Sequence, residues 1–294
     1  MQLIKTTSIG CTAFTNLARD HDAYVLGKTS KGLFINIPDR RLIFLSLESF
    51  RGPLTITLDE IESGFNHVTP GDPAWIKPGS ILFPDADFII STEGSEIWQP
   101  APASRPLEKH EQYQNLLRIS DEVILKKSGV GLSRLIPFLL GSPNVYPESQ
   151  LFSPINWDDI LEIQSQIRNS GAEDLALYLT SLLGAGQGLT PSADDFTIGL
   201  LLSLNRWRNL LLPNNSLQDF NHMLVKAANK RTTLLSANLI ECAASGLADE
   251  RLINTLDFVV TGVAREPEIV PHLLNWGNSS GIDAFVGMLV SLTT

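Results

Sequence analysis

The feature that most constrains the fold is residues 184–204, which read GAGQGLTPSADDFTIGLLLSL. Three glycines alternate at its start, a Thr-Pro-Ser segment follows, and two adjacent aspartates stand before an almost unbroken apolar run. A hydroxyl residue and a proline with an acidic side chain about one turn later are typical of a helix N-terminus. Because the run after the aspartates is apolar on all sides, we expect a helix that is buried rather than half exposed.

The start of this helix can be capped in two ways. Thr190 is a candidate N-cap with Pro191 at the first helical position, and Ser192 with Asp195 is an alternative box-like cap. With either cap, two carboxylates and several N–H groups lie at the N-terminus of a buried helix. Such an N-terminus can bind phosphate, carboxylate or carbamoyl groups, and its aspartates are candidate Mg²⁺ ligands or proton acceptors. The simpler interpretation is that both aspartates only cap the helix and neutralise its dipole.

Two familiar phosphate-binding motifs are excluded. A dinucleotide fingerprint follows a strand, whereas residues 172–183, just before the glycines, have the pattern of a helix. A P-loop needs a lysine after its last glycine, and none follows Gly188.

A second copy of the motif lies near the end of the chain. Both copies have the pattern S-x-x-D-x-x-x-G at a constant offset of 88 residues: Ser192, Asp195 and Gly199 in the first, Ser280, Asp283 and Gly287 in the second. A serine and an aspartate three residues apart also form a self-sufficient helix cap. Glycine inside a helix, however, costs about 1 kcal/mol relative to alanine. The matched glycines predict that two buried helices cross closely, with their N-termini side by side as an oxyanion or phosphate site.

The fold class predicted for the whole chain is α+β. Residues 1–104 are expected to form a small antiparallel β-rich domain, with strands at Ala23–Leu26, Gly32–Ile37, Leu42–Ser46, Leu54–Leu58 and Phe88–Ile90. A proline-rich linker is expected at residues 99–106. Residues 105–294 are expected to be all-helical, with two buried glycine-containing helices.

The predicted helices follow from apolar periodicity and capping residues. Before the first buried helix we expect helices at residues 107–127, at 132–140 with a break at Pro137, after the cap residue Asn156, and at 172–183. Between the two buried helices we expect a long helix from a capping box at Ser216–Asp219 to about Gly246, followed by helices at 249–260 and 266–276.

The long helix carries a polar segment between the two motif copies. Thr232 and Ser236 are four residues apart, so they would share one face, and the neighbouring Arg231 is a natural partner for a carboxylate or phosphate. An exposed basic turn whose hydroxyls bond back to the backbone explains the same residues equally well.

Composition argues against several classes of function. The chain has 22 Lys and Arg against 32 Asp and Glu, a net charge of −10, which opposes binding to nucleic acid or to an anionic membrane. Two cysteines give no disulfide framework, so a cytoplasmic protein is expected. Neither a signal-peptide core nor a run of about 18 apolar residues is present. The five histidines have no metal-ligand spacing.

These motifs together resemble the AllH-like family, whose named member is a subunit of bacterial oxamate carbamoyltransferase. The resemblance rests on Gly186-x-Gly188-Leu-Thr-Pro-Ser-x-Asp-Asp-Phe196, Arg231-Thr-Thr-x-x-Ser236 and Ser279-Ser280-Gly281-x-Asp283, and it extends to residues 8–16 and 52–56. Ala193 departs from the family, which usually has glycine there. The resemblance implies a role in the phosphorolysis of oxalurate to oxamate and carbamoyl phosphate, in allantoin catabolism, together with two other proteins.

The loop chemistry assigns a role to each candidate residue. The catalytic candidates are Asp194, Asp195 and Asp283, and the first two are also the candidate Mg²⁺ ligands. The ligand-binding candidates offer N–H groups, hydroxyls or a guanidinium: Gly186, Gly188, Thr190, Ser192, Arg231, Thr232, Ser236, Ser279, Ser280 and Gly281.

Two classes of function remain open, and the sequence leaves undecided whether the chain is itself an enzyme. The first is a transferase subunit that handles a small anionic carbamoyl, carboxylate or phosphate compound within a complex. The second is a non-catalytic binding or scaffold subunit whose β-rich domain docks other subunits. A stand-alone kinase-like enzyme is disfavoured because the phosphate-binding lysine is missing.

Overall fold

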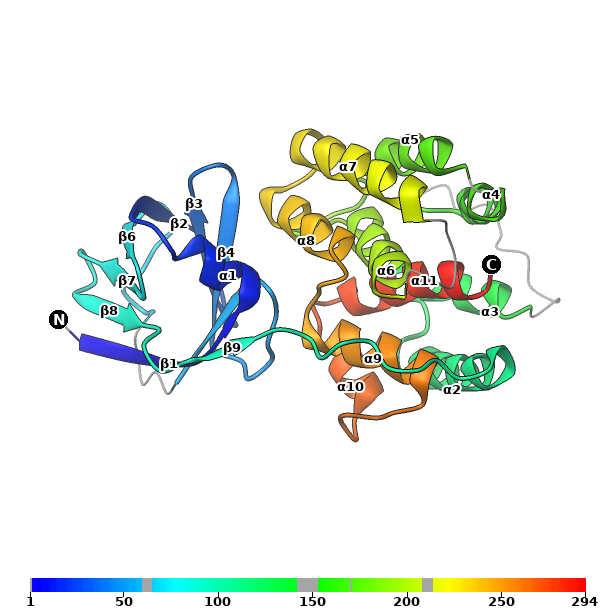
Figure 1. The fold of residues 1–294 in the computed structure, drawn as a ribbon, viewed down its shortest axis with the longest axis horizontal. Helices are drawn as coiled ribbons and strands as arrows, with labels where there is room; N and C mark the ends of the chain where they lie inside the picture. The colour runs from blue at the N-terminus through cyan, green and yellow to red at the C-terminus, as the bar shows by residue number, and fades with distance from the viewer. Residues whose placement is uncertain (1, 60–64, 142–152, 170, 208–213) are drawn as a thin grey trace. The chain divides into compact units, whose positions relative to one another are not determined.

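The structure is a computed structural model, and it describes residues 2–59, 65–141, 153–169, 171–207 and 214–294. The chain divides into two compact units, Met1–Ala101 and Pro102–Thr294. The first unit is rich in strands and the second is helical, so the α+β fold class predicted from the sequence is confirmed (Figure 1).

The described part of the first unit contains nine strands in one sheet. They are β1 (Gln2–Gly10), β2 (His21–Thr29), β3 (Gly32–Ile37), β4 (Arg41–Ser46), β5 (Thr55–Leu58), β6 (Pro73–Lys77), β7 (Ser80–Phe83), β8 (Phe88–Ser91) and β9 (Glu96–Trp98). The order is β5-β4-β3-β2-β6-β7-β8-β1-β9, and β5 also pairs with β1. Eight strands therefore close into a barrel, and β9 pairs with β1 outside the ring. A short helix, α1 (Cys11–Asn16), follows β1.

The sheet is mixed rather than wholly antiparallel as predicted. β1 runs parallel to β8 and β9, and β4 runs parallel to β5. Alternation within a strand predicts which side chains are buried, but the connections between strands decide the direction of each neighbour. Strand β6 illustrates the alternation, since Ala74 and Ile76 are buried inside the barrel while Trp75 between them is 45% exposed.

One row of outward side chains on the barrel is apolar, and we call it the outer row. Leu3, Ile89, Leu82 and Trp75 lie opposite one another on β1, β8, β7 and β6. Leu3 and Trp75 are exposed, and Leu82 and Ile89 are half-buried. A contiguous apolar strip of exposed and half-buried side chains is a typical protein-binding feature.

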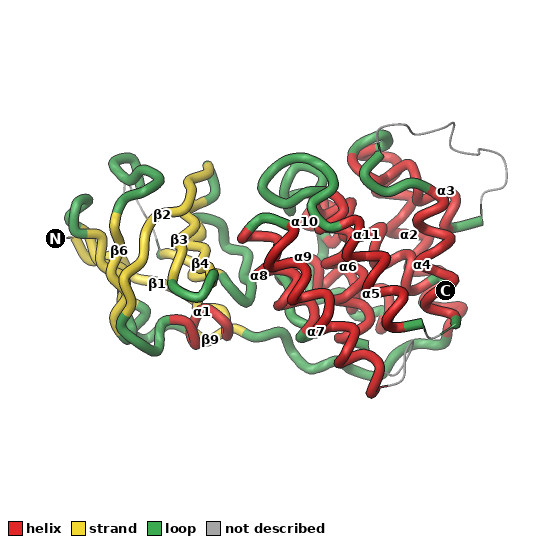
Figure 2. The backbone as a smooth tube through the Cα atoms, turned by 90° about the horizontal axis from the view of Figure 1, so that it is seen from above, coloured by secondary structure: helices red, strands yellow, loops and turns green. Residues whose placement is uncertain are grey.

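The second unit is helical in its described part. Its helices are α2 (Lys109–Lys127), the 3₁₀ turn η1 (Gly131–Leu135), α3 (Ile136–Leu139), α4 (Trp157–Arg168), α5 (Ala172–Leu182), α6 (Ser192–Arg206), α7 (Asn214–Arg231), α8 (Leu234–Ala244), α9 (Glu250–Thr261), α10 (Ile269–Leu274) and α11 (Ser280–Leu292). Helices α6 and α11 run through the middle of this unit, with α7 and α8 on one side and α9 and α10 on the other (Figures 1 and 2).

Several predicted helices are confirmed with shifted ends. Asn156 caps α4 in a reciprocal capping box with Asp159, as its sequence position predicts. Pro137 does not break a helix, because it occupies the first turn of α3, where its missing N–H is not needed. The capping box predicted at Ser216 is not the start of α7, which begins at Asn214, and the side chain of Ser216 lies outside the described residues.

The two glycine-containing helices are buried throughout, as predicted. Residues 193–205 of α6 and 281–291 of α11 are buried without interruption, and these two helices pack against each other more extensively than any other pair. At the crossing, a Cβ atom on Gly199 would lie 1.8 Å from the carbonyl oxygen of Ala284. A Cβ atom on Gly287 would lie 2.0 Å from the carbonyl oxygen of Phe196. Both positions therefore require glycine, because any side chain there would keep the two helix backbones from coming into contact.

Replacing Gly199 with alanine should destabilise the helical unit. Alanine raises helix propensity by about 1 kcal/mol, but the new methyl group collides with a backbone oxygen that no side-chain rotation can relieve. We expect the free energy of unfolding to fall by about 3 kcal/mol, the upper end for an overpacked core. Urea denaturation followed by circular dichroism at the helical signal measures the change.

Gly27→Ala is the matched control for this substitution. A Cβ atom there would meet only the Phe34 ring, at an ordinary contact distance of 3.9 Å. A Gly199→Ala protein as stable as Gly27→Ala would contradict the close crossing.

Candidate functional site

The N-termini of the two buried helices lie together. We call residues 184–195 the first entrance and residues 276–283 the second entrance. The Thr190 hydroxyl of the first lies 3.2 Å from the Ser280 hydroxyl of the second. Thr190 also donates to Asp195 Oδ2 over 3.1 Å. The convergence predicted from the repeated motif is therefore confirmed.

The contacts between the entrances follow the repeat reciprocally. Burial raises the pKa of both Asp195 and Asp283, and the rise is opposed at Asp195 by the nearby Ser280 hydroxyl and at Asp283 by the Ser192 hydroxyl. Because the two serines are equivalent in the repeat, as are the two aspartates, each copy of the motif supplies a hydroxyl to the carboxyl group of the other. The site is thus built from both copies and is incomplete with either one alone.

The cap of α6 differs from both predicted versions. Pro191 is the N-cap and makes no side-chain hydrogen bond, and Ser192 is the first helical residue. The Thr190 hydroxyl bonds Asp195 and meets Ser280 instead of capping the helix. The hydroxyl thereby joins two segments that are distant in sequence, which a local capping pattern does not reveal.

Asp194 ties the first entrance to the junction between α7 and α8. Its Oδ1 accepts the Gly184 N–H over 2.8 Å, and its Oδ2 accepts the Thr232 hydroxyl. Burial raises the pKa of Asp194, and the Thr232 hydroxyl, the Gly184 N–H and the nearby Ser236 hydroxyl oppose the rise. Thr232 therefore bonds this carboxyl group directly, whereas the Ser236 hydroxyl lies near it without forming a hydrogen bond.

That junction replaces the long helix predicted through this region, which was wrong. The Thr233 hydroxyl accepts the Ser236 N–H over 3.0 Å as the N-cap of α8, and it donates to the Leu189 carbonyl over 2.7 Å. Threonine side chains that bond local backbone groups compete with helix continuation. The break brings Thr232 to the first entrance, whereas a continuous helix would not place it there.

The turn η1 contributes groups that sequence reasoning missed. The Leu132 N–H donates to Asp283 Oδ1 over 2.6 Å. Gly131 has a φ of +52°, and a Cβ atom there would lie 2.2 Å from the same oxygen. Glycine is therefore required beside Asp283. The two glycines at 129 and 131 were a local signal, but only a helix stop can be inferred from them, because their partner is about 150 residues away.

Asp195 is the most perturbed carboxyl group of the three. It is fully buried, and burial raises its pKa well above the ordinary value; the charges of Asp283 and Asp194 raise it further, while the Ser280 and Thr190 hydroxyls oppose the rise. Burial likewise raises the pKa of Asp283, opposed first by the Leu132 N–H. Perturbed carboxyl groups of this kind are typical of proton-transfer sites.

Three buried polar atoms of the site have no hydrogen-bond partner among the described residues. They are Asp195 Oδ1, Asp283 Oδ2 and Ser236 Oγ. Unpaired buried oxygen atoms are costly, so structures rarely keep them without a reason. Their gathering at one place makes the entrances the candidate functional site.

Fewer free N–H donors are available than the sequence suggested. Ala193 donates to the Ala185 carbonyl, Asp194 and Asp195 donate to Pro191, and Gly281 donates to Trp276. Within the described residues, the N–H groups of Ser192 and Ser280 remain as the first-turn donors without a main-chain acceptor. Each copy of the motif therefore offers one N–H donor, again at equivalent positions.

The remaining candidate residues are Arg231, Ser279 and three glycines, and they differ in how they relate to the carboxyl groups. Arg231 is exposed and donates to the Thr180 carbonyl over 3.1 Å, so its charge points to α5 rather than to the carboxyl groups. Gly281 packs against the Leu273 carbonyl, 2.0 Å from where a Cβ would be. Gly186 and Gly188 have positive φ angles in an exposed loop. Ser279 precedes α11, and its hydroxyl helps to lower the pKa of Asp283.

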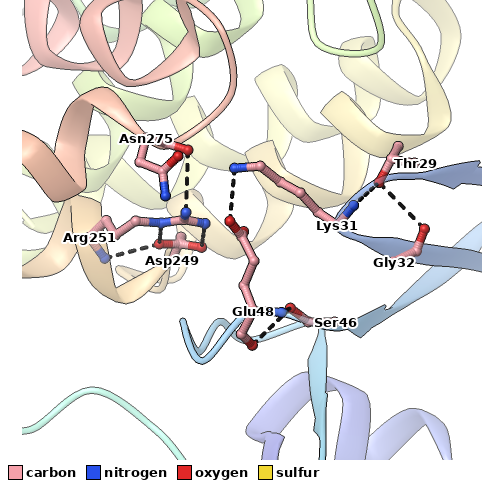
Figure 3. A network of polar contacts seen from close by, with 8 residues as sticks. All are labelled: Thr29, Lys31, Gly32, Ser46, Glu48, Asp249, Arg251 and Asn275. Carbon is pink, nitrogen blue, oxygen red and sulfur yellow. Dashed lines mark hydrogen bonds and ion pairs between the residues drawn. The ribbon is translucent and has the colours of Figure 1, made fainter. Parts of the chain in front are cut away.

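A buried ion pair fixes the approach to the second entrance (Figure 3). Arg251 donates from Nε and Nη2 to the two oxygens of Asp249, over 2.8 Å each, and from Nη1 to the Asn275 carbonyl over 3.4 Å. Arg251 is buried, so this fork is a rigid support. It positions the chain one residue before the second entrance begins.

The Mg²⁺ prediction gains no support from the donor groups present. Both Asp194 oxygens already accept protein hydrogen bonds. Across the described residues, no three His, Cys, Asp or Glu side chains are arranged to hold a metal ion. Oxygen donors for Mg²⁺ are normally ionised, whereas burial here disfavours the charged form.

The buried state of Asp195 should make stability depend on pH in a defined direction. Its folded-state pKa is raised, so its favourable contribution is present below the ordinary pKa and is lost as the pH rises through the folded-state value. Relative to Asp195→Asn, the wild-type free energy of unfolding should therefore fall as the pH is raised from about 4 towards neutrality. Urea denaturation across this range measures the difference.

Asp219→Asn, on an exposed position of α7, is the control for this series. It removes a carboxyl group from the surface and so gives the baseline for the comparison. A difference in stability between the wild type and Asp195→Asn that does not change with pH would show that the Asp195 carboxyl group is not held in a destabilising environment.

Comparison with known proteins gives one family match. The family model described as "Oxamate carbamoyltransferase subunit AllH" matches residues 182–292. No solved structure matches the chain. Among the helices of the described residues, none is both long enough and apolar enough to span a bilayer.

The matched segment contains both entrances and the α7–α8 junction, while η1 and the barrel lie outside it. The resemblance inferred from the sequence motifs is thus confirmed: over residues 182–292, the part that builds the paired helix entrances, the chain matches the AllH family.

Proposed function

We propose that this chain is a subunit of a cytoplasmic carbamoyltransferase complex and that it binds a small carbamoyl or carboxylate compound at the paired entrances. The observation that carries the proposal is the meeting of two repeat-related helix N-termini around buried carboxyl groups, at Thr190, Ser280 and Asp195. The family match covers this same segment and names a carbamoyltransferase subunit.

The mixture of donors and acceptors favours a carbamoyl group over inorganic phosphate. A carbamoyl group has an oxygen that accepts hydrogen bonds and an NH₂ group that donates them. The N–H groups of Ser192 and Ser280 suit the oxygen, and the hydroxyl and carboxyl oxygens suit the NH₂. Phosphate is an anion with more acceptors than donors, and among the described residues neither Lys nor Arg is a main cause of the pKa shifts of the three carboxyl groups. Phosphate would therefore meet acidic groups without a compensating cation.

Among the three candidate catalytic aspartates, the contacts favour Asp195 for proton transfer. Asp194 and Asp283 each accept a main-chain N–H, from Gly184 and Leu132, which suits residues that hold loops in place. Among the described residues, Asp195 is approached by the Thr190 and Ser280 hydroxyls but by no main-chain N–H group, and one of its oxygens is unpaired. A carboxyl group with a raised pKa can donate a proton to a departing amide nitrogen at neutral pH. Asp194 and Asp283 stay candidates for the same role.

Ligand titration of the purified chain tests this function directly. Oxamate and carbamoyl phosphate should bind in a calorimeter, and inorganic phosphate should bind more weakly. Asp195→Asn should lower the affinity about tenfold, as expected for one lost charged hydrogen bond. In the assembled complex, the same variant should lose about a hundredfold in turnover if Asp195 transfers a proton.

The exposed Asp219→Asn variant should bind and turn over like the wild type. If Asp195→Asn kept both full ligand affinity and full complex activity, the entrances would not be the ligand site.

A second candidate function, a scaffold subunit, is favoured by the outer row of the barrel. Leu3 and Trp75 are 57% and 45% exposed at the ends of an apolar strip across four strands. A subunit that docks its partners through the barrel would cover this strip. The two functions are compatible, because the helical unit can bind a ligand while the barrel holds the complex together.

Replacing Leu3 and Trp75 together with serine should disrupt assembly without affecting the helical site. Loss of this apolar contact is expected to weaken association by at least about tenfold, measured by co-purification with co-expressed partner subunits. Oxamate binding should be unchanged. Val263→Ser, an equally exposed apolar position on the helical unit, is the control. Normal assembly of the double variant would remove the outer row as a docking site.

A further inference from the structure

The two aspartates that are equivalent in the repeat, Asp195 and Asp283, have different neighbours. Asp283 Oδ1 accepts the Leu132 N–H over 2.6 Å. Among the described residues, no main-chain N–H group bonds Asp195, which is approached by the Thr190 and Ser280 hydroxyls. Leu132 belongs to η1, which packs against α11. The turn therefore acts on one copy of the motif and makes the two halves of the site unequal.

Gly131 allows η1 to come this close to Asp283. Its φ is +52°, and a Cβ atom there would lie 2.2 Å from Asp283 Oδ1 and 3.0 Å from the Cβ atom of Ser279. Gly129, two residues earlier, also has a positive φ, of +80°, but a Cβ atom there would meet only the Arg134 guanidinium, no closer than 3.8 Å. The positive φ angles explain both glycines. Only Gly131 is also required by the approach to Asp283.

The contact with η1 determines which carboxyl oxygen of Asp283 stays available. A carboxyl group is planar, so a short hydrogen bond to Oδ1 also sets where Oδ2 lies. Asp283 is fully buried, and its Oδ2 has no hydrogen-bond partner among the described residues, although the Ser192 and Ser279 hydroxyls lie near the same carboxyl group. Asp194 differs, because both of its oxygens accept hydrogen bonds. Asp283 is therefore held by one oxygen and keeps the other for a further partner.

We propose that η1 is part of the ligand site, beside the two entrances, and that Gly131 is a positioning residue: it lets the Leu132 N–H hold Asp283 so that Oδ2 forms a hydrogen bond with the ligand. The inference rests on the proposed function, since it concerns the same ligand. A buried oxygen without a partner is costly, and a ligand that bonds it removes the cost. Because the orientation of the carboxyl group is fixed before binding, little entropy is lost when the bond forms.

The proposal extends the site beyond the segment shared with the family. Residues 182–292 match the AllH family, and η1 precedes them in the chain. It also gives the two equivalent aspartates separate tasks. Asp283, held by a main-chain N–H group, orients the ligand, while Asp195, which has no such bond, stays the proposed proton donor. Two identical halves would present the ligand with two identical carboxyl groups.

The test measures oxamate affinity by titration calorimetry of the full chain, for two glycine variants that carry the same kind of backbone strain. Gly131→Ala should lower the affinity about tenfold, as expected for the loss of a hydrogen bond to a charged group, because its methyl group displaces the Asp283 carboxyl. Gly129→Ala is the matched control: it also places alanine at a positive φ, but nothing moves at Asp283, so the affinity should stay at the wild-type value. Circular dichroism at the titration temperature verifies that each variant is folded.

A double variant shows whether Gly131 acts through Asp283. Asp283→Ala alone should also lower the affinity about tenfold. Gly131→Ala combined with Asp283→Ala should lower it no further, because the bond is already lost. A merely structural role of Gly131 would instead multiply the two losses, to about a hundredfold. If Gly131→Ala does not fold, Asp283→Ala still decides, since wild-type affinity in that variant would overturn the proposal.

The remaining outcomes separate this inference from the proposed function. Wild-type affinity in Gly131→Ala, an equal loss in Gly129→Ala, or multiplied losses in the double variant would overturn the inference and leave the proposed function standing. Failure of the wild type to bind both oxamate and carbamoyl phosphate would instead overturn the proposed function and, with it, this inference.

Discussion

The structure of the helical unit depends on one backbone contact made twice. Where α6 and α11 cross, Gly199 faces the Ala284 carbonyl and Gly287 faces the Phe196 carbonyl. The two contacts are equivalent under the 88-residue repeat, so the helices pack as related halves. Because the crossing lies within two turns of each N-terminus, it forces the two entrances together. The hydroxyl and carboxyl contacts between the entrances are a consequence of this close packing.

Close packing creates an electrostatic problem that the polar residues only partly solve. Three carboxyl groups, those of Asp194, Asp195 and Asp283, are fully buried, and burial raises the pKa of each. Hydroxyls and N–H groups from other elements oppose the rise, yet Asp195 and Asp283 each keep an unpaired oxygen. Burial of an apolar helix N-terminus would cost less free energy. The retention of such groups at one place is understandable if they serve a ligand or a proton.

The site also clarifies what kind of molecule it suits. Helix N-termini alone favour anions, but most first-turn N–H groups here are used internally, and Arg231 bonds the Thr180 carbonyl instead of the carboxyl cluster. What remains is a mixture of donors and acceptors around Ser192 and Ser280. The proposed binding of a carbamoyl compound rests on this mixture and on the family match over residues 182–292.

The sequence by itself determined the elements of the site and their pairing. Short-range signals, such as the apolar run after Asp195 and the glycines spaced 88 residues apart, are enough to predict two buried helices that cross. Only the tertiary structure decided the partners. The break after Arg231, the contact of Thr190 with Ser280 and the Leu132 N–H at Asp283 each depend on segments that are 44 to 151 residues apart. Capping and periodicity act within a turn or two, whereas a buried polar group is satisfied by whichever segment the packing brings next to it.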